Sequence, residues 1–465
     1  MRLAVALLVV SLLSQPATAA VLHVPADYPT IQQALNAATA GDVVLVAAGT
    51  YHEHLLWGGG QAGVKLHSES GAAMTVIDAD GTNFGIDVVN APGTEIVGFT
   101  IQNGVRTGFN RGGGITVENS SISITDDVVQ NCSAYWGGGI YVDHSSTASI
   151  LRSTIQHNAS VSSAGGIDYE GLPGQIDGNV IANNSSYTAG GLLLATDMVV
   201  SNNHFISNVA GSAGGAMVAQ NHQVVRGNEF RGNSAQYSGA LEASGSAVVD
   251  SNTFVGNSAV ERAGAIQAYG SAVISRNLFL DNTVQIHGGA IYAAFLGTNP
   301  TIRDNVIVRN SSLTHGGGVM IDYFGSATLE SNTIVLNQAP TGGGVLVTQT
   351  ATAVLRNNIV SHSQAGGGVA RDASSVVSMT CNDVWGNVGS DYVGMPSKTG
   401  SQGNISSDPL YCGLATLDFH LASTSLCALA NQPTCGSLIG ALDVGCDAPV
   451  RTQATTWGGL KARYR

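Results

Sequence analysis

The fold is decided between residues 203 and 282, where one six-residue pattern is written four times: Asn203-His204-Phe205-Ile206-Ser207-Asn208, Asn228-Glu229-Phe230-Arg231-Gly232-Asn233, Asn252-Thr253-Phe254-Val255-Gly256-Asn257 and Asn277-Leu278-Phe279-Leu280-Asp281-Asn282. The second Asn of the pattern falls at positions 184, 208, 233, 257, 282, 310 and 337, so the period is 24 to 28 residues. A period of this length indicates a solenoid, in which each unit packs on the next.

A second marker has the same period. Eleven triplets of small residues each precede an aliphatic residue, at Ile115, Ile140, Ile167, Leu192, Met217, Leu241, Ile266, Ile291, Val319, Val345 and Val369. Gly and Asn oppose helix and favour tight turns, and short alternating apolar runs favour strands. About 25 residues then form one coil, with coils about 4.8 Å apart. We predict an all-β chain, a right-handed parallel β-helix whose inward Asn side chains form ladders.

The N-terminal residues predict export and a lid. Residues 1–19 have the charged, apolar and small-residue parts of a secretory signal peptide, and the apolar run is too short to span a bilayer. Thr30 with Gln33 fits a capping box at the start of an amphipathic helix that would cover the open end of the stack. We therefore expect a secreted or cell-surface protein whose β-helix, with this cap, covers residues 20–410.

Cysteines gather at the C-terminal end. Four of the six, Cys412, Cys427, Cys435 and Cys446, lie in residues 411–447, which predicts a cap held by disulfides in an exported protein. We expect Cys412 to pair with Cys427 and Cys435 to pair with Cys446, although four cysteines allow three pairings. Residues 448–465 read as a polar linker and an aromatic, basic tail, either disordered or a sorting signal.

Composition restricts the partners. With 18 basic and 31 acidic residues the formal net charge is -13, which disfavours nucleic acid and anionic membranes, because both require clustered Lys and Arg. Anionic polysaccharides become less attractive for the same reason. Only 11% of the residues are charged, and 60 are Gly. This composition suits a rigid rod, expected to be a monomer that binds a glycan or a surface protein.

Two resemblances to known families support this interpretation. Phe-x-x-Asn alternating with Gly-Gly-Ala-aliphatic, as in Gly288-Gly289-Ala290-Ile291, resembles the repeat of the polymorphic outer-membrane protein family over residues 110–390. Members of that family are surface adhesins, so adhesion is implied. Tyr28-Pro29-Thr30-Ile31-Gln32-Gln33-Ala34-Leu35 and Asp408-Pro409-Leu410-Tyr411-Cys412 are similar to segments of secreted pectin-lyase-like β-helix proteins. That likeness implies the fold and leaves the chemistry open.

An acidic face is the first candidate site. Alternation along a strand places the first and third residues after each aliphatic marker outside the core. In the early coils this puts Glu118, Asp143, Asp168 and Glu170 on one outer face. Glu118, Asp143 and Glu170 could hold Ca²⁺, and all four carboxylates could serve a polysaccharide lyase or glycoside hydrolase. The alternative is a solvated acidic stripe with no ligand.

Aromatic side chains on the same face are the second candidate site. Trp136 and Tyr141 could stack a sugar ring beside the acidic residues, and Tyr269 and Tyr292 could do so further along the rod. Our preferred interpretation is a binding or adhesion rod, with a polysaccharide-degrading enzyme and a structural surface-layer component as the alternatives.

Overall fold

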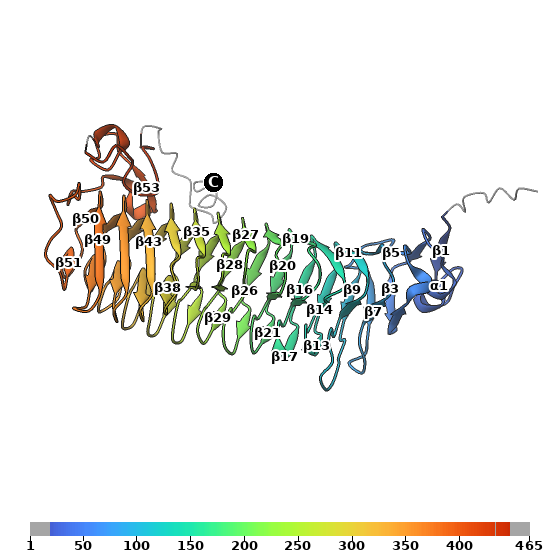
Figure 1. Cartoon of the computed structure of the whole chain (residues 1–465). Coiled ribbons are helices and arrows are strands. Elements are labelled where there is room, and N and C mark those ends of the chain that lie inside the picture. The colour runs from blue at the N-terminus through green and yellow to red at the C-terminus, as the bar shows by residue number, and fades with distance from the viewer. Residues whose placement is uncertain (1–18, 433, 447–465) are drawn as a thin grey trace, which may run out of the picture.

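The computed structural model describes residues 19–432 and 434–446. They form a straight rod of stacked coils (Figure 1), in which three sheets of 15, 14 and 14 parallel strands run the length of the rod. The predicted parallel β-helix is therefore confirmed. The predicted signal peptide, except Ala19, and the predicted tail at 448–465 lie outside the described residues.

Each coil contributes one strand to each long sheet. Sheet A runs from β1 (Val21–Val24) to β49 (Val376–Thr380), and sheet B runs from β3 (Gly49–His52) to β50 (Asp383–Trp385). A shorter sheet D of eight strands runs from β13 (Ser133–Trp136) to β41 (Ser311–Ser312). The strands of sheet C are β4 (Leu55–Trp57), β7 (Ile86–Val89), β10 (Ile115–Glu118), β14 (Ile140–Val142), β18 (Ile167–Tyr169), β22 (Leu192–Leu194), β26 (Met217–Ala219), β30 (Leu241–Ala243), β34 (Ile266–Ala268), β38 (Ile291–Ala294), β42 (Val319–Asp322), β45 (Val345–Val347), β48 (Val369–Arg371) and β51 (Tyr392–Val393).

The repeated Asn residues form the predicted ladders inside the rod. Asn233 is fully buried, and its side-chain Nδ2 donates to the carbonyl of Phe205 and to Oδ1 of Asn257, both at 2.9 Å. Its own Oδ1 accepts from the backbone N and the Nδ2 of Asn208, at 2.9 and 3.0 Å. Each amide thus satisfies polar groups of neighbouring coils, which keeps the coils in register.

Phenylalanines of the same repeat stack in the core. The rings of Phe205, Phe230, Phe254 and Phe279 lie 4.7 to 4.9 Å apart and within 6° of parallel. These residues face one another because their strands in sheet B are paired without any shift.

The small-residue triplets lie where the chain turns into sheet C, and they bring coils very close together. A Cβ on the middle residue Gly264 would lie only 2.1 Å from the carbonyl oxygen of Gly289 in the next coil. The first residue of the following triplet, Gly288, has φ +71, and a Cβ there would lie 3.0 Å from the Cβ of Tyr292. The triplet turn therefore packs over the first outward residue of the sheet C strand.

This packing corrects one expectation. Thr116, Tyr141, Asp168 and Tyr292 were predicted to lie on the outer surface, yet the structure leaves none of them more than 2% exposed. Their side chains do point away from the inner core, but the adjoining turn covers them. Glycine permits this cover because it has no side chain to occupy the space.

A short helix covers the N-terminal end, as predicted. Helix α1 (Ile31–Ala37) buries Ile31, Ala34 and Leu35, and the Thr30 side chain accepts a hydrogen bond from the Gln33 backbone N at 3.2 Å.

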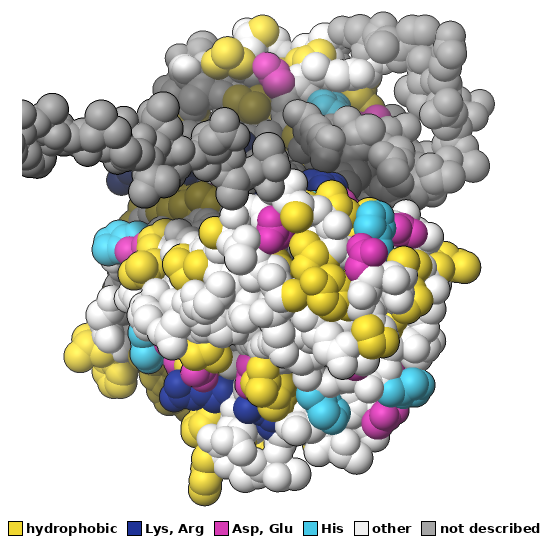
Figure 2. All heavy atoms as spheres, turned by 90° about the vertical axis from the view of Figure 1, so that its right-hand side faces the viewer, with side chains coloured by type: hydrophobic (Ala, Val, Ile, Leu, Met, Phe, Trp, Pro, Cys, Tyr) yellow, Lys and Arg dark blue, Asp and Glu magenta, His cyan; other side chains and the backbone are white. Residues whose placement is uncertain are grey.

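Figure 2 looks onto this end of the rod and shows few Lys or Arg side chains, while several His side chains lie beside Asp or Glu. No helix among the described residues has the length and apolarity needed to cross a membrane.

The C-terminal cap contains two disulfides, but the predicted pairing is wrong. Cys381 pairs with Cys435 and Cys412 pairs with Cys446, while Cys427 is a buried free thiol. The reason is that the cap folds back along the rod. Phe419 of β53 (Asp418–Leu421), which pairs with β52 (Tyr411–Gly413), packs against the outer side of sheet B, so Cys435 reaches the last coil at Cys381.

Candidate functional site

An exposed aromatic cluster lies beside strand β14, near the N-terminal third of the rod. Tyr135 and Trp136 are half-buried, and their ring centroids are 4.3 Å apart in an edge-to-face arrangement. Phe109, 76% exposed, reaches from the preceding coil to within 4.7 Å of the Tyr135 ring and 6.3 Å of the Trp136 ring. We call these three residues the Trp136 platform.

One arginine fixes the inner edge of the platform. The Arg111 guanidinium carbon lies 5.4 Å from the centroid of the Trp136 ring and 4.9 Å from that of Tyr141. Arg111 and Trp136 occupy equivalent positions of consecutive coils, each directly before a glycine triplet, and their backbones pair there. Cation–π contact of this kind orients the rings and leaves the guanidinium edge available for hydrogen bonds.

A carboxylate and a histidine lie next to Tyr141. The Tyr141 hydroxyl donates a short hydrogen bond to Glu170, and His144 Nε2 lies 3.3 Å from the same carboxylate oxygen. Burial, and then the bond to Glu170, raise the pKa of Tyr141 above its usual value, so this hydroxyl remains a donor. Glu170 is half-buried and His144 is exposed, and Tyr141 and Arg111 connect this pair to the platform.

Asp168 lies beneath the platform. Its Oδ2 accepts from the Ser163 hydroxyl at 2.7 Å, whereas its Oδ1 is buried without a hydrogen-bond partner among the described residues. Burial raises the pKa of this carboxyl to about 7, although the hydrogen bond from Ser163 lowers it. The charge of Glu170 raises the pKa as well, and that of Arg111 lowers it. Asp168 is therefore largely protonated below neutral pH.

We predict a pH dependence of stability from this residue. The folded-state pKa of about 7 lies above the ordinary value of 3.8, so the stabilising contribution is full below 3.8 and is lost as the pH rises through 7. Asp168→Asn should flatten this part of the stability profile and raise the melting temperature at pH 8 relative to the parent protein. Thermal melts of both proteins from pH 4 to pH 8 test this, and parallel profiles would contradict it.

The predicted acidic face does not converge on one point. Strand pairing does place Glu118, Asp143 and Glu170 at successive axial positions, because Val117, Val142 and Tyr169 are paired. However, the Asp143 carboxylate turns back to its own loop, accepting from the Ser145 backbone N at 3.2 Å and the Ser146 hydroxyl. Glu118 is exposed. Each carboxylate thus has a different surrounding.

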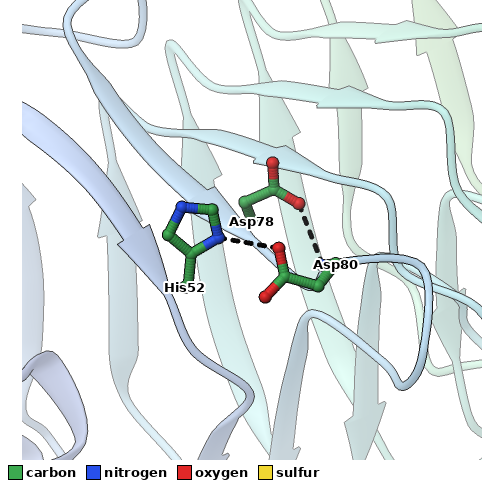
Figure 3. Close-up of side chains that lie close together, drawn as sticks. All are labelled: His52, Asp78 and Asp80. Atoms are coloured by element: carbon green, nitrogen blue, oxygen red, sulfur yellow. Dashed lines mark hydrogen bonds and ion pairs between the residues drawn. The ribbon is translucent and has the colours of Figure 1, made fainter.

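Elsewhere on the rod, three possible metal ligands do come together. Among the described residues, only His52, Asp78 and Asp80 bring three such atoms within 4.8 Å of one another (Figure 3). His52 Nδ1 and Asp80 Oδ1 are 2.7 Å apart. Asp78 accepts from Gln102 at 2.8 Å and Asn103 at 2.9 Å, so it ends a ladder of side-chain amides. Both oxygens of the Asp78 carboxylate therefore already accept hydrogen bonds from protein side chains.

Tyr269, the remaining predicted aromatic residue, lies further along the rod, directly after strand β34 of sheet C. Tyr269 is half-buried, five coils beyond Trp136, and its ring stacks on Phe295 with a centroid distance of 5.9 Å.

The sequence did not place Phe109, Tyr135 or Arg111 among the candidate site residues, although Arg111 was recognisable as a cation near the acidic face. Arg111 could have been placed at the site from the repeat. The positions directly before the triplets are in register from coil to coil, and Arg111 and Trp136 both occupy such positions. Phe109 lies in the irregular segment before the first triplet, where the repeat gives no register to count from.

The fold defines a parallel β-helix protein, and comparison with known proteins agrees. The family described as "Right handed beta helix region" matches residues 113–284, 191–338 and 297–407, which together span well over half of the chain. The chain therefore belongs to this right-handed β-helix family. No curated protein sequence matches it significantly.

Solved structures show the same architecture at low identity. A PL6 family alginate lyase, AlyGC, has a TM-score of 0.51 and 15% identity, and the match covers 94% of this chain and 60% of the lyase. This chain thus spans less than two thirds of that enzyme. The catalytic domain of a GH87 α-1,3-glucanase has a TM-score of 0.41 and 13% identity, covering 84% of this chain and 70% of the domain. At this identity the likeness to the lyase establishes the fold alone.

Proposed function

We propose that this protein is an exported rod that binds a neutral polysaccharide along the turns that flank sheet C, with the Trp136 platform as a sugar-stacking subsite. The observation that carries the proposal is the cluster of three rings, of which Phe109 is 76% exposed, with Arg111 over the Trp136 ring. Arg111 also lies over Tyr141, which donates to Glu170. Aromatic rings pack against the apolar faces of sugar rings, while adjacent charged and polar groups hydrogen-bond the hydroxyl groups.

Charge supports a neutral ligand. The protein carries a formal net charge of -13, and Arg111 at the platform has Glu170 nearby, bonded to the same Tyr141. An anionic chain would be repelled by this surface. The proposed ligand belongs to the same broad class, the polysaccharides, as the substrate of the alginate lyase. Export agrees with the two disulfides, which are typical of oxidising compartments.

Binding is favoured over cleavage at this site. A glycosidase needs two carboxyl groups open to the substrate, one on each side of the scissile bond. Here Asp168 is 1% exposed beneath the triplet turn, and Asp143 is held by its own loop. Glu170 is bonded to Tyr141 and His144, and the exposed Glu118 lies two coils away from it, about 10 Å along the axis.

The platform is tested by removing its central ring. Trp136→Ala should weaken binding of soluble glucomannan at least about tenfold, because a stacking surface is lost, whereas Trp136→Phe should retain most of it. Leu172→Ala is the matched control, since Leu172 is 53% exposed but lies outside the platform. Affinity electrophoresis or calorimetry against glucomannan and alginate measures this. Tighter binding to alginate, or equal binding by Trp136→Ala, would contradict the proposal.

A further inference from the structure

A second cluster of aromatic rings and an arginine lies further along sheet C. The Arg262 guanidinium carbon is 4.8 Å from the centroid of the Tyr237 ring and 5.3 Å from that of Phe295. Arg262 also hydrogen-bonds Tyr269. Like Arg111, it directly precedes a triplet, and its backbone pairs with His287 of the next coil. Arg262 thus occupies the position of Arg111, and Tyr237, like Trp136, directly precedes a triplet.

Three rings of this cluster form a row along the rod axis. Tyr269 stacks on Phe295 at 5.9 Å, and Phe295 stacks on Tyr323 at 5.8 Å, with planes within 26° and 13° of parallel. They come from three consecutive coils, at or just after strands β34, β38 and β42. Tyr323 is 42% exposed, and Phe324 beside it is 59% exposed, so the row reaches the surface.

The turn beneath this row has positive φ in six consecutive coils, from Asn221 to Gln349. Asn221, Gly245 and Gly270 occupy the position first, and Phe295 and Tyr323 then adopt φ of +82 and +47. A large aromatic residue has a steric cost at positive φ that Asn and Gly largely avoid.

A carboxyl group without a donor completes the cluster. Glu242 occupies the same axial position as Gln267, next to the coil of Arg262. Within the described residues, neither a side chain nor a backbone group donates a hydrogen bond to it, and its half-buried position raises its pKa. A ligand hydroxyl group would satisfy this carboxyl.

We infer that Tyr237, Glu242, Arg262, Tyr269, Phe295 and Tyr323, the Arg262 cluster, form a second sugar-binding subsite, so that the protein holds one extended polysaccharide chain along its axis. This inference rests on the proposed function. The two subsites are five coils apart, which is about 24 Å at about 4.8 Å per coil. Only a straight chain of several sugar units can reach both, which favours extended β-1,4-linked polymers such as glucomannan over a disaccharide.

Chain length gives the inference its first test. Joining two weak subsites through one ligand raises the overall affinity well above that of either subsite alone. Arg262→Ala should therefore weaken glucomannan binding about tenfold or more, while the weak binding of cellobiose at the Trp136 platform stays nearly unchanged. Trp136→Ala should leave residual glucomannan binding, which the double variant Trp136→Ala Arg262→Ala abolishes.

Two further variants separate binding from folding. Phe295→Gly removes one ring and also relieves the positive φ, so that relief offsets part of the lost packing, and binding should fall with little change in melting temperature. Arg309→Ala is the matched control, since it removes a guanidinium that is paired with Asp281 on sheet B and should leave binding unchanged.

The outcomes distinguish the two proposals. If Trp136→Ala weakens glucomannan binding but Arg262→Ala and Phe295→Gly do not, the second subsite is overturned and the proposed function stands. If the Arg262 and Phe295 variants weaken binding while Trp136→Ala does not, the second subsite stands and the Trp136 platform is overturned. Absence of glucomannan binding by the parent protein overturns both.

Discussion

Replacing Asn233 by Ala is expected to lower the free energy of unfolding by about 3 kcal/mol or more. The substitution leaves the buried backbone N and side-chain Nδ2 of Asn208 without their acceptor, and the Phe205 carbonyl without its donor from Asn233. Each buried polar group left unsatisfied costs about 1 to 3 kcal/mol. Urea unfolding followed by circular dichroism measures the loss.

The control for this prediction is an asparagine outside the ladders. Asn299 is exposed, and its replacement by Ala should change stability by less than about 0.5 kcal/mol. An equally small effect for Asn233→Ala would mean that the inward amides do not hold the coils together.

Replacing Gly264 by Ala is expected to have an effect of similar size or larger. The new Cβ would lie 2.1 Å from the carbonyl oxygen of Gly289 and 2.7 Å from the backbone N of Thr283, and both atoms belong to the next coil. No side chain can move to make room, so the coils themselves must separate. We expect a loss of about 3 kcal/mol, or a failure to accumulate folded protein.

Gly60→Ala serves as the comparison. A Cβ at Gly60 meets nothing within 4 Å, and the residue is exposed near the N-terminal end. This substitution should be neutral or slightly stabilising, because Ala has fewer unfolded conformations than Gly. Similar folded yields and midpoints for Gly264→Ala and Gly60→Ala would show that the coils are not packed as closely as described.

The sequence predicted the architecture well because the repeat is expressed in residues with a strong conformational preference. The last Asn of the pattern, the large apolar residue three positions before it and the small-residue triplet each return once per coil, so their register followed from counting alone. Helix α1 at the N-terminal end was also predictable, because Thr30, Gln33 and the apolar face of residues 31–38 are local sequence signals.

The surface was harder to predict, because alternation tells which way a side chain points and not what covers it. Tyr141 and Tyr292 do point away from the inner core, but the glycine turn of their own coil packs over them. Asp143 was expected to join its axial neighbours, yet the hydroxyl and backbone donors of the turn at Ser145 and Ser146 hold it.

The repeat period carries no information about contacts between segments that lie far apart in the sequence. The cap returns along sheet B instead of simply closing the end, so Cys435 meets Cys381, 54 residues earlier, and Cys427 is left unpaired. One hint was present in the sequence, because Leu278-Phe279-Leu280 and Val306-Ile307-Val308 are apolar on both faces of the strand. Such runs indicate strands covered on both sides.

Hydrogen–deuterium exchange with and without soluble glucomannan locates the proposed polysaccharide binding along the turns that flank sheet C. We expect slower exchange in two regions, residues 106–118 with 135–145 and residues 262–270 with 293–325, and little change in sheet B beneath the cap. Protection on another face, or none at saturating polymer, would contradict it.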